Sequence, residues 1–302
     1  NKLSVRSTIS GVQARLYHEK SKSQTAQYTD AKDSDASGGA PIVCTDCTDT
    51  GNNTNWFFVT PTIAGSLYSD EGSTPIASKT IAISYNGGGV TATAETDAGG
   101  QFILSGATMT GGTILTLFVQ GESEDAITVV IGSGGSMTGI DLYQNRLIVR
   151  SESGSAAVTN TTLTAAKSTT SISTDIPNIL VNSASTGITI AAAKELFIFS
   201  GSTFEPNGAL TIHDIDIDGT FTFEQNALSI SGTWDTDATT GTFTGTGVVT
   251  FTSAGSETLR SSSNAFNTII FNNTSGTWSL SDAMDVNGPF TLSGGVFSQG
   301  NN

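Results

Sequence analysis

The residues best spaced for chemistry are three aspartates, Asp214, Asp216 and Asp218, followed directly by Gly219. They have the spacing of the first ligands of a calcium-binding loop, but Gln225 stands where such a loop requires a bidentate glutamate. The neighbouring apolar residues alternate as they do on a strand: Ile215, Ile217, Phe221 and Phe223. We therefore predict a strand with three carboxylates on one solvated face. Calcium bound by these aspartates is the alternative, and no other cofactor is expected.

The two cysteines, Cys44 and Cys47, form a single Cys-x-x-Cys. A structural zinc site needs four ligands, and the chain has two histidines, His18 and His213. A redox function would need a thioredoxin-like βαβ context, which the sequence lacks. We expect a local disulfide, which would be oxidised if the chain is secreted. A bridge between subunits is the alternative.

The sequence offers no convincing catalytic set. Its acidic segments at 69–72, 122–125 and 235–237 are typical of turns. Paired carboxylates can cleave glycosidic bonds, but enzymes built on parallel solenoids generally bring basic groups to their groove. Residues 151–302 contain few such groups: Lys167, Lys194, Arg260 and His213. Two histidines also give no Ser-His-Asp arrangement, so we predict that the protein is not an enzyme.

Tryptophans are the side chains best suited to stack on sugars. Trp234 and Trp278 occupy predicted strand positions in the C-terminal half of the chain. Corresponding positions of other strands in that half carry Phe or Ile, which favours core packing of both tryptophans over glycan binding. Surface glycans remain a candidate partner.

Charge is distributed unevenly along the 302 residues, which carry a net charge of -15. Residues 1–32 contain six cations and two anions, whereas the rest of the chain is strongly acidic. An acidic chain does not neutralise phosphates, so we expect no nucleic-acid partner. No apolar run approaches the length of a membrane span. The basic segment is interpreted either as a solvated tail or as a partner for an acidic surface, in the same chain or in a neighbouring one.

The segment 1–16 alternates apolar and polar residues, with a change of phase after Gly11. This predicts one long amphipathic strand with a bulge at Gly11. The following stretch, about 19–55, is polar and offers no evident partner strand. The strand must then pair with a distant part of its own chain or add to another subunit. Its proposed assembly residues are Leu3, Val5, Arg6, Ile9, Val12, Arg15 and Leu16.

Residues 57–145 contain short alternating runs separated by turn signals, which is typical of a β-sandwich of about seven strands. Two motifs at 65–75 and 96–102 are an acidic turn leading to Pro75 and a Thr-Asp-x-x-Gly-x-Phe entry. They resemble the prealbumin-like sandwich of carboxypeptidase regulatory-like domains and of B-type repeats of bacterial surface adhesins. The resemblance implies a spacer module.

Residues 146–302 are rich in Thr, Ser, Gly and Asn, with isolated large apolar residues. Segments 178–190 and 268–280 match, as do 197–204 and 290–297, which indicates two repeats of roughly 90 residues. Short strands with Gly and Asn corners predict a parallel β-solenoid. Motifs at 232–234, 241–251 and 264–273 resemble the Thr/Gly-rich solenoid repeats of large bacterial surface and adhesin-like proteins.

Together these features predict an all-β protein with an N-terminal extended strand and polar linker (1–56), a β-sandwich (57–145) and a parallel β-solenoid (146–302). The resemblances imply an extracellular structural protein secreted to a bacterial surface, and we expect the natural polypeptide to continue beyond the given sequence. We expect head-to-tail self-assembly into a filament, in which the basic strand adds to an acidic neighbour. The alternative is a monomeric carbohydrate-binding adhesin module.

Overall fold

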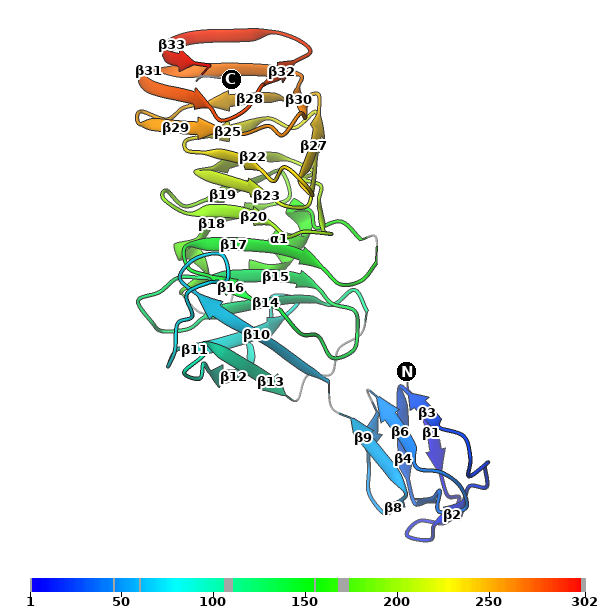
Figure 1. Cartoon of the computed structure of the whole chain (residues 1–302). Coiled ribbons are helices and arrows are strands. Elements are labelled where there is room, and N and C mark those ends of the chain that lie inside the picture. Colours follow the sequence, from blue (N-terminus) through cyan, green and yellow to red (C-terminus); the bar gives the residue numbers. More distant parts are fainter. Residues whose placement is uncertain are drawn as a thin grey trace.

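The structure is a computed structural model, and it describes residues 2–45, 47–59, 61–105, 111–154, 156–167 and 174–299. Nearly all of its regular structure is β-strand, and most neighbouring strands of the C-terminal half pair in parallel (Figure 1). The protein is therefore all-β and contains a parallel β-solenoid, as the sequence predicted.

The N-terminal unit, residues 2–59, consists of three stacked turns. Each of its three sheets takes one strand from each turn, and all pairs are parallel. The sheets are β1(Leu3–Arg6)-β4(Thr29–Lys32)-β7(Thr48–Asp49), β2(Ala14–Arg15)-β5(Ser34–Asp35)-β8(Asn53–Thr54) and β3(Gln24–Gln27)-β6(Ile42–Thr45)-β9(Trp56–Val59). Figure 1 shows this unit in blue.

The prediction of one bulged strand over residues 1–16 is wrong, because the chain turns a corner at Gly11. Gly11, Asp33 and Asn52 all have positive φ, at 77°, 51° and 55°. They stack as one corner of successive turns: the N–H of Gly11 and the amide of Asn52 donate to the Asp33 carboxylate at 3.0 and 2.8 Å. The phase change therefore marks a change of sheet between β1 and β2.

The polar linker expected around 19–55 is also wrong, because those residues build the second and third turns. The interior of this unit is filled mainly by small side chains, and Ile42 is the largest of its buried apolar residues. Thr29, Ala31, Ser34, Ala36 and Cys44 are all buried. Small and hydroxylated residues produce little hydrophobic periodicity, so the sequence pattern hid these strands.

Residues 62–143 pair mainly antiparallel. The strands are β10(Thr62–Tyr68), β11(Thr80–Tyr85), β12(Val90–Glu95), β13(Gln101–Ser105), β14(Ile114–Val119), β15(Ile127–Ile131) and β16(Leu142–Tyr143). They form the orders β12-β11-β14-β15 and β13-β10-β16, and buried residues from both groups make one cluster. This segment begins after β9, later than the predicted boundary at 57. Its prealbumin-like character stays a prediction.

The C-terminal solenoid begins at β17(Arg146–Ser151), which lies parallel to β15. One face continues through β20(Glu195–Ile198), β23(Asp214–Ile217), β26(Trp234–Thr236), β29(Ser256–Leu259) and β31(Thr268–Leu280). A second contains β18(Leu180–Ala184), β19(Gly187–Ile190), β22(Ala209–Ile212), β25(Leu228–Ile230), β28(Val248–Phe251), β31 and β33(Phe290–Ser298). A third contains β21(Thr203–Phe204), β24(Thr220–Glu224) and β27(Thr242–Gly245), and β30(Ala265–Phe266) pairs with β32(Asp285–Val286).

The structural period is one turn of about 20 residues. On the second face Ile188 lies beside Leu210, Leu210 beside Leu228 and Leu228 beside Val249. The two segments that define the 90-residue repeat fold differently: β18 and β19 form an antiparallel hairpin, whereas β31 is a single strand shared by two faces. The match between segments 178–190 and 268–280 therefore reflects similar composition in turns that lie far apart along the solenoid, and not a shared local fold.

Two short helices were not expected from the sequence. They are α1(Asn160–Lys167) and the 3-10 helix η1(Ile176–Asn178). Leu163 and Ala166 of α1 are buried in the same cluster as the first solenoid turns, so this helix covers that end of the core. None of the described helices is long and apolar enough to cross a membrane.

Aromatic rings fill the solenoid interior. Trp234 and Trp278 are fully buried, together with Phe221, Phe251 and Phe271. Trp234 lies 4.9 Å from Phe243 and 5.0 Å from Phe266 between ring centroids, in edge-to-face geometry. These two tryptophans are core residues, which fits the preferred interpretation of their positions.

Candidate functional site

The three predicted aspartates belong to one strand and the position that follows it. Ile215 and Ile217 of β23 are buried, whereas Asp214, Asp216 and Asp218 point outward and are half-buried. The Asp214 carboxylate accepts a hydrogen bond of 2.7 Å from the N–H of Thr233. The strand conformation therefore replaces the calcium-loop arrangement, because alternate side chains of a strand do not converge on one ion.

Asp216 meets two carboxylates from other elements. Single oxygens of Glu71, Glu195 and Asp216 all lie within 4.8 Å of one another. Glu71 belongs to the turn after β10, Glu195 to β20 and Asp216 to β23. We call these three residues the carboxyl cluster. It joins the antiparallel segment to the first turns of the solenoid.

Arg146 of β17 holds two members of the carboxyl cluster. Its Nη2 lies 2.7 Å from Glu71 Oε1, and its Nε lies 2.6 Å from Glu195 Oε1. The Arg146 side chain is 17% exposed. Asp216 has no ion pair of its own among the described residues, although Arg260 also interacts with it electrostatically, so a proton or another cation beside Asp216 is favoured.

Burial raises the pKa of Asp216 to about 8, and the nearby carboxylates of Asp218, Glu195 and Glu71 add to the shift. Burial also raises the pKa of Glu195, against the opposing effect of Arg146. Asp216 Oδ1 is buried without a hydrogen-bond partner in the described residues. Asp216 is therefore mainly protonated at neutral pH.

An aromatic patch explains the burial of Asp216. Phe197 is its neighbour in register on β20, so both side chains lie on the outward face. Phe197 packs edge-to-face on Tyr143 at 5.5 Å between ring centroids, and Tyr143 packs likewise on Tyr68 at 6.2 Å. This apolar patch removes water from one side of the carboxyl cluster, and the charged form of Asp216 loses solvation.

The carboxyl cluster has two chemical capacities. Three carboxyl oxygens are suitable ligands for a hard divalent cation. A protonated carboxyl beside ionised ones is also the arrangement from which general acids donate. In both cases Asp216 supplies the group that changes its protonation state.

Sequence reasoning found Asp216 but missed Glu71, Glu195 and Arg146. Glu71 lies in an acidic segment that was interpreted as a turn, and it does lie in one. Glu195 is one solenoid turn before Asp214, as their register shows. A search for carboxylates spaced by one turn could have found Glu195, whereas the arrival of Glu71 depends on tertiary packing.

The predicted assembly residues lie in the first turn of the N-terminal unit. Leu3, Ile9 and Val12 are 68%, 62% and 54% exposed. Arg6 forms an ion pair with Asp30, and Arg15 lies 3.6 Å from Asp35. Leu16 donates its N–H to the Asp35 carbonyl at 2.7 Å. Val5 pairs in register with Ala31, so the strand pairs within its own chain, which was one of the two alternatives.

Cys44 and Cys47 are joined in a disulfide, with a Cα–Cα distance of 5.6 Å. Cys44 is fully buried at the end of β6. The bridge is local, and it links β6 to the segment that leads into β7, the first strand of the third turn of the N-terminal unit.

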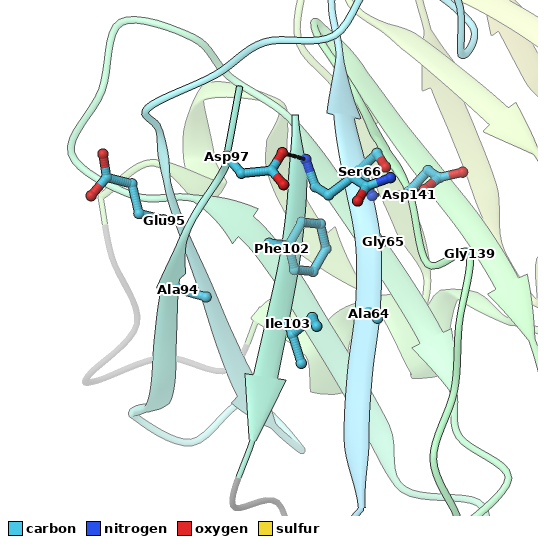
Figure 2. A pocket seen from close by; sticks show the side chains of 11 residues that line it. Ala64, Gly65, Ser66, Ala94, Glu95, Asp97, Phe102, Ile103, Gly139 and Asp141 are labelled. Carbon is cyan, nitrogen blue, oxygen red and sulfur yellow. Dashed lines mark hydrogen bonds between the residues drawn. The ribbon is translucent and has the colours of Figure 1, made fainter. Parts of the chain in front are cut away.

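A hollow of about 450 Å³ lies beside β10, β12 and β13, away from the carboxyl cluster. Figure 2 shows its carboxylates: Asp97 is hydrogen-bonded to the backbone of Gln101, at 2.9 Å, and Glu95 points away from the other two. Asp141 accepts the N–H of Ser66 at 2.8 Å. These acids hold backbone groups and do not converge, so this hollow is a weaker candidate than the carboxyl cluster.

Comparisons with protein families, with curated proteins and with solved structures give no match, so function is inferred from the residues themselves.

Proposed function

We propose that the protein is a non-enzymatic structural protein of a bacterial cell surface, which assembles from identical chains into an extracellular fibre. The position of β1 carries this proposal. β1 is the outermost strand of the sheet β1-β4-β7, so one of its edges has no described strand beside it. An open edge of this kind can receive a strand from another chain.

The free edge of β1 is accessible through alternate residues. The N–H of Leu3 donates to the Tyr28 carbonyl at 2.9 Å, so Leu3 and Val5 face β4. In a parallel ladder the residues between them face the other way. Ser4 and Arg6 therefore present their backbone groups to a neighbour, and addition can occur without breaking the pairing of β1 with β4.

Ion pairs within the chain already engage two of the basic residues that were expected to attract an acidic neighbour. Arg6 and Arg15 are engaged by acids of their own chain. Lys20 and Lys22 are exposed. The attraction to an acidic neighbour then falls chiefly to these lysines, and it weakens with salt because both groups are solvated.

The experiment that tests this proposal is electron microscopy of the chain with a proline on the free edge. Ser4→Pro removes an outward N–H and leaves those of Leu3 and Val5 in place, so fibres should be lost while the fold is kept. Ser10→Pro is the matched control. It lies in the turn closed by the 3.2 Å bond from Val12 N–H to the Ile9 carbonyl, a position that accepts proline. Monodisperse wild-type particles would contradict the proposal.

A carbohydrate-binding module that acts as a monomer in a longer surface protein is the second candidate. Tyr17 is 75% exposed and Phe57 is 57% exposed, so the N-terminal unit offers aromatic rings to a sugar. Trp234 and Trp278 are fully buried and do not support this alternative. Binding of the Ser4→Pro variant to a glycan array would favour the adhesin over the fibre.

Calcium at the carboxyl cluster is a further proposal, which concerns stability and not catalysis. Glu71, Glu195 and Asp216 would supply the ligands. A cation must displace the proton of Asp216, so its affinity should rise as the pH approaches 8.

A further inference from the structure

The last strand that the structure describes, β33, has one open edge. It pairs with β31, and no described strand lies on its other side. The N–H of Ile269 donates to the Pro289 carbonyl at 3.0 Å. By the alternation of a parallel ladder, Thr291 faces β31, and the backbone groups of Phe290 and Leu292 face the open side.

The apolar core is exposed at the same edge. Phe290, Leu292 and Val296 are 44%, 44% and 58% exposed. Phe290 and Phe297 continue the series of aromatic rings that fills the solenoid interior, with ring centroids 5.6 and 4.9 Å from that of buried Phe271. A hollow of about 380 Å³ lies there, lined by Leu280, Met284, Val286, Phe290, Phe297 and Gln299. One further layer of side chains would bury this surface.

Opposite charges mark the first and the last turns of the described chain. After Arg260 the sequence contains Asp282 and Asp285 and no lysine or arginine. Asp285 is exposed on β32. The first turn carries five cations and one anion: Lys2, Arg6, Arg15, Lys20, Lys22 and Glu19. Arg6 and Arg15 are paired with Asp30 and Asp35 of their own chain, so Lys20 and Lys22 supply its exposed positive charge. A contact between these two surfaces would bring unlike charges together.

The first turn of the N-terminal unit offers both a strand edge and an apolar surface that suit the open side of β33. Its strand β1 has a free parallel edge, and its apolar residues Leu3, Ile9 and Val12 are largely exposed. We propose that the open end at β33 is covered by the first turn of a second copy of this chain. This inference rests on the proposed fibre and names its acceptor. Because the two surfaces differ, the contact does not close on itself and adds copies in one direction.

Two complementary variants test the pairing. Ser4→Pro blocks the free edge of β1, and Leu292→Pro removes an N–H from the open side of β33. Each variant alone should stay monomeric, because the contact needs a free β1 edge on one copy and a free β33 edge on the other, and each variant retains only one of the two. An equimolar mixture should form a particle of twice the mass and no fibres, since one contact is possible between the two variants. Mass photometry and negative-stain microscopy of the full chain measure both results.

A second variant guards against misfolding of Leu292→Pro. Leu292→Lys keeps the backbone and places a charge on the exposed apolar end, so it should also stop growth and should form the mixed dimer with Ser4→Pro. Ser10→Pro is again the control and should polymerise as the wild type does. Raising the salt concentration should slow growth of the wild type severalfold, because attraction between exposed charges is screened.

The outcomes separate this inference from the fibre itself. Wild-type fibres that persist in both Leu292 variants would show that β1 adds elsewhere, which overturns the acceptor and leaves the proposed function standing. Fibres from the mixture of blocked variants would overturn the one-contact geometry. A wild type that stays monomeric would overturn both proposals.

Discussion

Asp216 is held between an apolar patch and other carboxyl groups. Phe197 and Tyr143 exclude water on one side, while Glu71 and Glu195 lie on the other with a single guanidinium between them. Charge in that position is unfavourable, so the proton is retained to about pH 8. At the residue scale the carboxyl cluster therefore makes the free energy of unfolding depend on pH.

Asp216→Asn should remove much of this pH dependence. The folded protein keeps, up to about pH 8, a proton that the unfolded chain loses near its ordinary pKa of 3.8, so the free energy of unfolding falls between about pH 4 and about pH 8 and levels off above that window. The slope is roughly 1.4 kcal/mol per pH unit within that window. Thermal unfolding of wild type and variant at pH 5 and pH 8 should show a variant advantage at pH 8. Asp285→Asn, at an exposed site, is the control.

The same variant also tests the calcium proposal. Calcium at pH 8 should raise the unfolding temperature of the wild type and leave Asp216→Asn unchanged, because a ligand that binds the native state stabilises it. Equal pH slopes in wild type and variant would contradict the account of Asp216. An equal calcium response in both would place any ion elsewhere.

At the element scale, β10 depends on a close approach of two backbones. A Cβ added to Gly65 would collide with the carbonyl of Ile140, which is backbone and does not yield as a flexible side chain does. The strand is part of the β13-β10-β16 sheet, whose side chains share a core with β11 and β14. Gly65 is therefore required by packing.

Gly65→Ala should lower the free energy of unfolding by about 3 kcal/mol, since overpacking against backbone forces the strand to move. Gly135→Ala is the matched control in the same segment, because a Cβ there would meet no atom within 4 Å. Urea denaturation of both variants measures the difference. Equal stability of the two variants would show that β10 adjusts without cost.

At the scale of the whole molecule, no strand pairing joins residues 2–59 to the rest of the described chain. The interiors also differ: small side chains fill the N-terminal unit, whereas Phe and Trp fill the solenoid. Units with separate cores and no shared sheet are expected to unfold separately.

Ala31→Leu should therefore shift one of two unfolding transitions. Ala31 is fully buried in the interior, so the larger side chain should cost about 1–3 kcal/mol in the N-terminal unit alone. Thr25→Leu, on the exposed side of β3, is the control and should leave both transitions in place. Calorimetry of the full chain resolves the transitions. A single transition that moves as a whole would mean that the two units are coupled.

The sequence by itself determined the all-β class, the parallel solenoid of the C-terminal half and the strand that bears Asp214 and Asp216. These features depend on local alternation: Ile215 and Ile217 point inward wherever the strand lies, so the aspartates between them point outward. The preference for buried Trp234 and Trp278 follows from the same repetition, because equivalent positions carry Phe or Ile.

The tertiary structure alone decided which residues meet across turns. The N-terminal turns were hidden because Ala31, Ser34 and Cys44 are too small or too polar to mark a core, and Gly11 marks a corner only once Asp33 and Asn52 stack on it. The carboxyl cluster was hidden because Glu71 reaches Asp216 from a different segment of the fold. Local periodicity specifies which way a side chain faces, but its neighbours depend on the register between strands far apart in the chain.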